Sequence, residues 1–88
     1  MSAETLALLR ERLATLQPES LAIEDESHLH AGHAGARGGG HYAVTIVAAA
    51  FAGHGTVARH RLVYAAAGDL MTGPVHALRV RALAPGEV

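Results

Sequence analysis

Residues 41–50, with the sequence HYAVTIVAAA, decide the fold of this chain. The large side chains of Tyr42, Val44 and Ile46 fall on every second position, which is the period of a β-strand with one face toward a core. Such a strand must be covered by other elements on its apolar face, so the segments on either side are interpreted around it.

Four further elements are predicted from periodicity. Leucines at helical spacing predict an amphipathic helix over 3–16, and a short strand follows over 20–25. A second helix is predicted over 56–71 and a last strand over 75–83. The order helix, strand, strand, helix, strand predicts an α+β fold. The first two strands would pair antiparallel, and both helices would cover one face of a three-stranded sheet.

The same periods predict which side chains face the core. In the last strand, alternation places His76 on the same side as Leu78 and Val80. The four residues after Ala84 are expected to fray. One stripe of the second helix is expected to pack on the sheet, and it consists of Val57, His60, Tyr64, Ala67 and Met71.

Length and composition narrow the class of function. The 88 residues suit one domain, 1–88, whose small core leaves little room for a closed catalytic pocket. We therefore expect a binding module rather than an enzyme. The formal net charge of −1 provides no overall attraction to nucleic acid or membrane. Without a bilayer-spanning apolar run or a signal-peptide pattern, the expected compartment is the cytoplasm.

Histidine is the unusual residue type in this chain. There are seven, and His28, His30, His33 and His41 lie within fourteen residues, in or beside the glycine-rich loop predicted over 28–40. Histidine is a common metal ligand, so the loop could bind an ion, although a merely exposed polar loop is the competing interpretation. The chain has no cysteine, so an iron–sulfur cluster would need thiolates from another chain. That requirement favours a site shared at a protein–protein interface.

Two other features suggest binding chemistry. His76 follows a Gly-Pro break and opens a predicted strand, where it is able to reach the surface. Arg59 and Arg61 lie on the second predicted helix and could contact nucleic acid, although helix arginines are more often simply solvated. Ser27 resembles no strained nucleophile turn, and no lysine is present for a phosphate-binding Walker motif.

Several linked motifs occur in a fixed order and spacing over nearly the whole chain, from about residue 5 to residue 85. They are Asp25-Glu26-Ser27 with the following His/Gly loop, Gly40-His41-Tyr42-Ala43-Val44, Phe51-Ala52-Gly53, Arg59-His60-Arg61-Leu62-Val63-Tyr64 and Val75-His76-Ala77-Leu78. Together these motifs resemble the BolA family. The resemblance implies a fold similar to a class II KH domain. It also implies partnership with a monothiol glutaredoxin and a shared 2Fe–2S cluster, to which glutaredoxin and glutathione supply thiolates.

Carried over residue by residue, the resemblance implies that His76 is one cluster ligand. The second family ligand falls on His30, with His33 and His28 as alternatives. The main hypothesis is thus a glutaredoxin partner in iron–sulfur cluster trafficking or iron regulation. The alternatives are a DNA-binding transcriptional regulator of stress response or morphology, and a plain histidine-loop site for zinc or copper. A weak homodimer is left open, and no membrane partner is expected.

Overall fold

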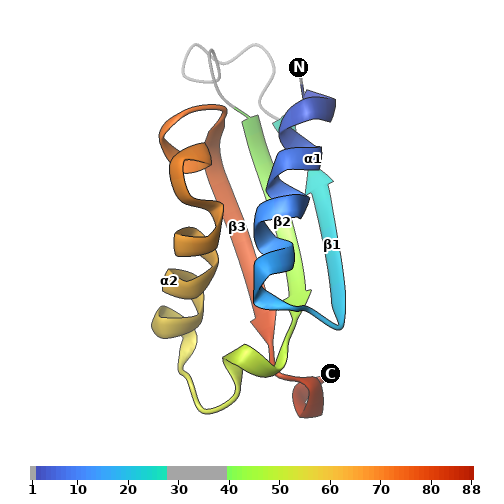
Figure 1. Cartoon of the computed structure of the whole chain (residues 1–88), viewed down its shortest axis with the longest axis vertical. Helices are drawn as coiled ribbons and strands as arrows, with labels where there is room; N and C mark the ends of the chain where they lie inside the picture. The colour runs from blue at the N-terminus through green and yellow to red at the C-terminus, as the bar shows by residue number, and fades with distance from the viewer. Residues whose placement is uncertain (1, 28–39) are drawn as a thin grey trace.

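The computed structural model of the chain describes residues 2–27 and 40–88. Two α-helices in this part lie side by side across one face of a three-stranded sheet (Figure 1). The predicted α+β architecture, its element order and the one-sided helical layer are confirmed. The elements are α1 (Ser2–Leu13), β1 (Ser20–Asp25), β2 (Gly40–Val47), α2 (Thr56–Ala67) and β3 (Val75–Leu83).

The central strand of the sheet is β2, with β1 on one side and β3 on the other. The β1–β2 pair is antiparallel, as predicted, whereas β2 and β3 run parallel. A parallel pair needs a crossover connection, and α2 provides it. The parallel arrangement has a direct consequence for the site, because β2 and β3 begin at the same end of the molecule (Figure 1).

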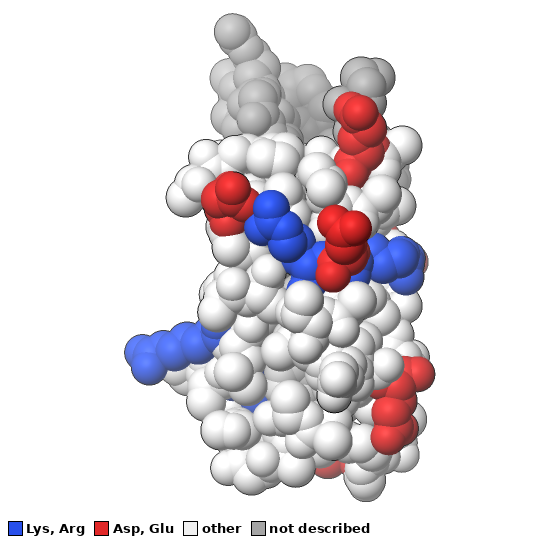
Figure 2. All heavy atoms as spheres, in the orientation of Figure 1, with Lys and Arg blue, Asp and Glu red and all other residues white. Residues whose placement is uncertain are grey.

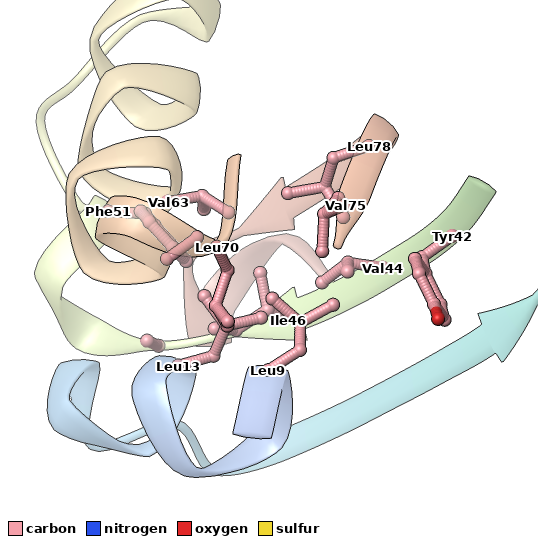
Figure 3. Close-up of a cluster of buried hydrophobic side chains, with 12 residues drawn as sticks. Leu9, Leu13, Tyr42, Val44, Ile46, Phe51, Val63, Leu70, Val75 and Leu78 are labelled. Atoms are coloured by element: carbon pink, nitrogen blue, oxygen red, sulfur yellow. The ribbon is translucent and has the colours of Figure 1, made fainter. Parts of the chain in front are cut away.

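The hydrophobic core lies between the helices and the sheet (Figure 3). The alternating residues Tyr42, Val44 and Ile46 of β2 are all buried, as their period predicted. Both helices, β3 and the segment after β2 complete the cluster. Its other large members are Leu9, Leu13, Phe51, Val63, Leu70, Val75 and Leu78.

The central strand is shorter than the predicted range of 41–50. It ends at Val47, which pairs with Ser20 of β1 and Leu83 of β3. Ser20 is the first residue of β1 and Leu83 is the last of β3. Residues after Val47 therefore have no neighbouring strand with which to pair. The chain instead forms a 3₁₀ turn over Ala49–Phe51, which places the Phe51 ring in the core with no exposed surface.

The second helix also differs from its prediction. The α-helix ends at Ala67 because Gly68 has a φ of 59°, a left-handed value that favours glycine, and a 3₁₀ segment continues to Thr72. The buried residues are Val63, Ala67 and Leu70, whereas Val57 is 64% exposed. Ala67 of the predicted stripe is buried, but its buried neighbours are Val63 and Leu70 instead of the predicted Tyr64 and Met71. The run Leu62–Ala67 is apolar all round, and its period cannot select one face.

The segment after Ala84 is held in place, so the predicted fraying was wrong. Pro85–Glu87 forms a 3₁₀ turn in which a Glu87 carboxylate oxygen accepts the backbone N–H of Ala84 at 3.0 Å. The same carboxylate accepts two hydrogen bonds from the guanidinium of Arg59 on α2. A bidentate pair of this kind is stronger than a single contact, so it ties the C-terminal turn to the helix.

Replacing Phe51 with Ala tests whether this 3₁₀ turn is a core element. Loss of a fully buried phenyl ring is expected to cost about 3–5 kcal/mol of the free energy of unfolding. That is a large part of the roughly 5–15 kcal/mol available to a small domain. Urea denaturation followed by far-ultraviolet circular dichroism measures it, with exposed Val57→Ala as the control. Equal midpoints for the two variants would contradict the assignment of Phe51 to the core.

Candidate functional site

A β-bulge at the start of β3 determines where His76 points. Gly40 pairs with Val75, but the next residue of β2, His41, pairs with Ala77, so His76 is an extra residue in the ladder. An inserted residue re-aims the side chains around it. Val75 and Leu78 are consequently both buried while His76 is exposed. The prediction that His76 shares the face of Leu78 and Val80 was wrong for this reason.

The imidazole of His76 lies beside that of His41 on the neighbouring strand. The ring centroids are 5.2 Å apart, and the ring planes are tilted by 47°. His41 is half-buried, and its Nε2 atom is shielded from solvent. The pair therefore has an accessible member and an enclosed member, both at the end of the sheet where β2 and β3 begin.

The backbone of His41 is held on both sides by the segment that follows β1. The Glu26 N–H donates to the His41 carbonyl at 2.7 Å, and the His41 N–H donates to Ser27 Oγ at 3.0 Å. Ser27 is itself oriented by its N–H, which donates to Asp25 Oδ1 at 2.9 Å in an Asx turn. The Asp25-Glu26-Ser27 motif therefore holds the backbone of His41 in place, a role that the sequence alone did not reveal.

A shallow cleft of about 280 Å³ lies next to this motif, and Glu26, His41, Tyr42, Ala77 and Arg79 line it. Arg79 Nη2 and Glu26 Oε2 form an ion pair at 2.7 Å, which balances the charge on this side of the histidines. Burial raises the pKa of the Tyr42 phenol, and the nearby Asp25 carboxylate raises it further. The phenol therefore stays neutral beside the site.

The described residues contain one of the predicted cluster ligands, His76. The predicted loop ligand His30 and its alternatives His28 and His33 lie outside the described residues. Within 2–27 and 40–88, no group of three or more His, Cys, Asp or Glu side chains is arranged to hold a metal ion. The contact between His41 and His76 was missed, because sequence analysis grouped His41 with the loop. Cross-strand pairing becomes visible only in the sheet.

Of the two arginines considered for nucleic acid, Arg59 is already engaged within the chain. Its Nε donates to the His54 carbonyl at 2.7 Å and its Nη1 to the Ala82 carbonyl at 3.0 Å, in addition to the Glu87 pair. The Glu87 hydrogen bonds raise the pKa of Arg59. Arg61 is exposed. The face shown in Figure 2 carries acidic and basic side chains interspersed, without a continuous basic patch.

Comparison with known proteins identifies the family. A family model described as BolA-like protein matches residues 13–87. This chain belongs to the BolA family. Over 84 residues it is 42% identical to protein BOLA1, chloroplastic, of Arabidopsis thaliana, covering 90% of this chain and 52% of that protein. It is 39% identical over 82 residues to BolA-like protein 1 of Mus musculus, covering 92% and 58%.

A second Arabidopsis relative is longer. SufE-like protein 1, chloroplastic/mitochondrial, is 41% identical over 87 residues, which cover 91% of this chain and 24% of that protein. The chain thus spans between 24% and 58% of these three relatives. Solved BolA structures agree with the fold. Arabidopsis BolA1 has a TM-score of 0.80 at 40% identity and 93% coverage of both chains, and the BolA domain of SufE1 has 0.79 at 41% and 91%.

The relatives' names also bear on cellular location. Two of them include the word chloroplastic, one together with mitochondrial, so BolA proteins occur in more than one compartment. Cytoplasmic location of this chain therefore stays a prediction. Neither helix in the described part of the chain has the length and apolar character needed to cross a bilayer.

The pair between Arg59 and Glu87 predicts how stability depends on pH. Hydrogen bonds from Arg59 and from the Ala84 backbone lower the Glu87 pKa from 4.5 to about 2. A depressed folded-state pKa means that the unfolded chain binds the proton more readily. The contribution of Glu87 is thus fully present above pH 4.5 and is lost as the pH falls toward 2.

Glu87→Gln should therefore lower the free energy of unfolding at neutral pH, and the difference from the natural chain should shrink between pH 4.5 and pH 2. Urea titrations across this range measure the difference. In an Arg59→Met background, the same glutamate substitution should lose most of this pH-dependent effect. A difference that is constant with pH would contradict the assigned pair.

Proposed function

We propose that this BolA-family chain is a binding module that partners a monothiol glutaredoxin and supplies His76 as a ligand to a shared 2Fe–2S cluster. The observation that carries the proposal is the β-bulge, which exposes His76 at the end of the sheet. BolA proteins are generally binding modules rather than enzymes. An exposed side chain at one end of a small domain is suited to contact with a second protein.

The donor chemistry fits a cluster that is cargo shared between two proteins. Neutral imidazole is a recognised replacement for thiolate at some positions of a 2Fe–2S cluster, whereas the remaining ligands are normally sulfur. This chain contains no cysteine, so the thiolates would come from the glutaredoxin and from glutathione. Among the described residues, His76 is the ligand that this proposal assigns to the cluster.

The second ligand from this chain is assigned by family resemblance. His30 occupies the matching loop position, with His33 and His28 as the neighbouring alternatives. These histidines lie outside the described residues, so the proposal gives them no geometry. A BolA domain also occurs within a longer protein named SufE-like protein 1, a name that favours an iron–sulfur-related role for this family.

DNA binding by Arg59 and Arg61 stays a prediction from sequence. The intramolecular contacts of Arg59 argue against its availability for phosphate. If the chain did bind DNA through phosphate contacts, its affinity would fall steeply with salt concentration.

The proposed function is tested by assembling the complex anaerobically with a monothiol glutaredoxin, iron, sulfide and glutathione. The visible circular dichroism spectrum of the mixture should differ from that of the glutaredoxin homodimer. His76→Ala should return it to the homodimer form, because one cluster ligand is removed. His54→Ala is the matched control, since this exposed histidine lies beside Arg81 and Ala82, near the other end of β3 from the bulge.

Both variants should keep the far-ultraviolet spectrum and thermal midpoint of the natural chain, because both histidines are exposed. A cluster spectrum left unchanged by His76→Ala would refute the ligand assignment. Failure of the natural chain to alter the glutaredoxin spectrum would refute cluster sharing, and a salt-dependent DNA titration would then test the alternative function.

A further inference from the structure

We propose that His41 and His76 together bind one divalent transition-metal ion, zinc or copper, in this chain without any partner protein. The proposed site differs from the histidine-loop site considered from sequence, because its ligands come from two paired strands. It does not rest on the proposed role with glutaredoxin. Imidazole nitrogen suits zinc, copper and nickel among the first-row metals.

The separation of the two rings is compatible with one ion bound between them. A zinc–nitrogen bond of about 2.0–2.1 Å places the ion roughly 3.2 Å from the centre of each imidazole ring. Two such ligands at a tetrahedral angle would then have ring centres about 5.2 Å apart. The observed centroid separation is 5.2 Å. Tetrahedral coordination does not require coplanar rings, so the tilt of 47° is compatible with it.

The backbone on either side of both histidines is ordered. His76 is the inserted residue of the bulge, and the nearby side chains of Val75 and Leu78 are buried. The backbone of His41 is fixed by hydrogen bonds to Glu26 and Ser27. A ligand pair whose backbone is ordered before binding loses less conformational entropy when the ion arrives.

The surroundings suit a cation held by neutral ligands. Arg79 is the basic residue that lines the cleft beside His41, and its charge is balanced by Glu26 at 2.7 Å. His76 is exposed and His41 has its Nε2 atom shielded. Since the described residues supply two donors, water would complete the coordination.

Occupation of this site has a consequence for the proposed function. His76 cannot ligate a cluster and a separate ion through the same nitrogen, so a bound divalent ion would compete with cluster binding. The two ideas are nevertheless tested separately, because the metal site is examined in the chain alone, with zinc or copper as the probe.

The experiment starts from a variant in which the loop imidazoles are removed, His28→Gln/His30→Gln/His33→Gln. Isothermal titration with zinc should show one bound equivalent. Adding His41→Gln or His76→Gln should each weaken binding by more than the roughly 10–100-fold that loss of an outer-shell partner costs. Adding His54→Gln and His60→Gln together is the control and should leave the affinity unchanged, since both residues lie near the other end of β3, beside Arg81 and Ala82.

Imidazole NMR of the loop variant gives a readout that needs no substitution of His41 or His76. Resonances of His41 and His76 should shift together and saturate at one equivalent of zinc, and copper should broaden the same two. Loss of zinc binding in the loop variant would overturn the proposal. So would shifts confined to His76, or a His41→Gln variant that folds and binds as tightly as its parent.

Discussion

The central strand β2 carries Tyr42, Val44 and Ile46 on one face. This apolar face is buried only when both helices lie across it. Placing α2 on that face makes it the crossover between β2 and β3, so these strands must run parallel. Their first residues then meet at one end of the molecule. The proximity of His41 to His76 is thus a by-product of how the core is covered.

The bulge adds a second condition to this arrangement. Without an inserted residue, strict alternation would bury His76 in line with Leu78 and Val80 and would expose Val75. Because of the insertion, the Val75 side chain packs in the core and the His76 imidazole is exposed. The bulge therefore places a core residue and a candidate ligand at adjacent positions of β3. The BolA motif residues Asp25, Glu26 and Ser27 act at the same end of the sheet. Glu26 and Ser27 hydrogen-bond to the backbone of β2 at His41, and Asp25 orients Ser27.

Sequence periodicity predicted the central strand, the element order and the one-sided helical layer, since each depends on local spacing of apolar residues. It failed for features that depend on distant partners. The bulge arises from pairing with β2, and the C-terminal turn is held by Arg59, 28 residues from Glu87. The buried face of α2 was misassigned because Leu62–Ala67 is apolar throughout. His76 was singled out by sequence position and family resemblance, whereas its contact with His41 required the sheet.

The parallel pairing of β2 and β3 also has a kinetic meaning. His41 and His76 are 35 residues apart in the chain (76 − 41), and they become neighbours only after the whole crossover has closed. Contacts of such sequence separation are slow to form because the entropy of loop closure must be overcome first. The histidine pair is thus absent from partly folded chains that contain only the β1–β2 hairpin. Any ligand that bridges the two rings would therefore bind only the completed fold, and would stabilise it against separation of the two strands.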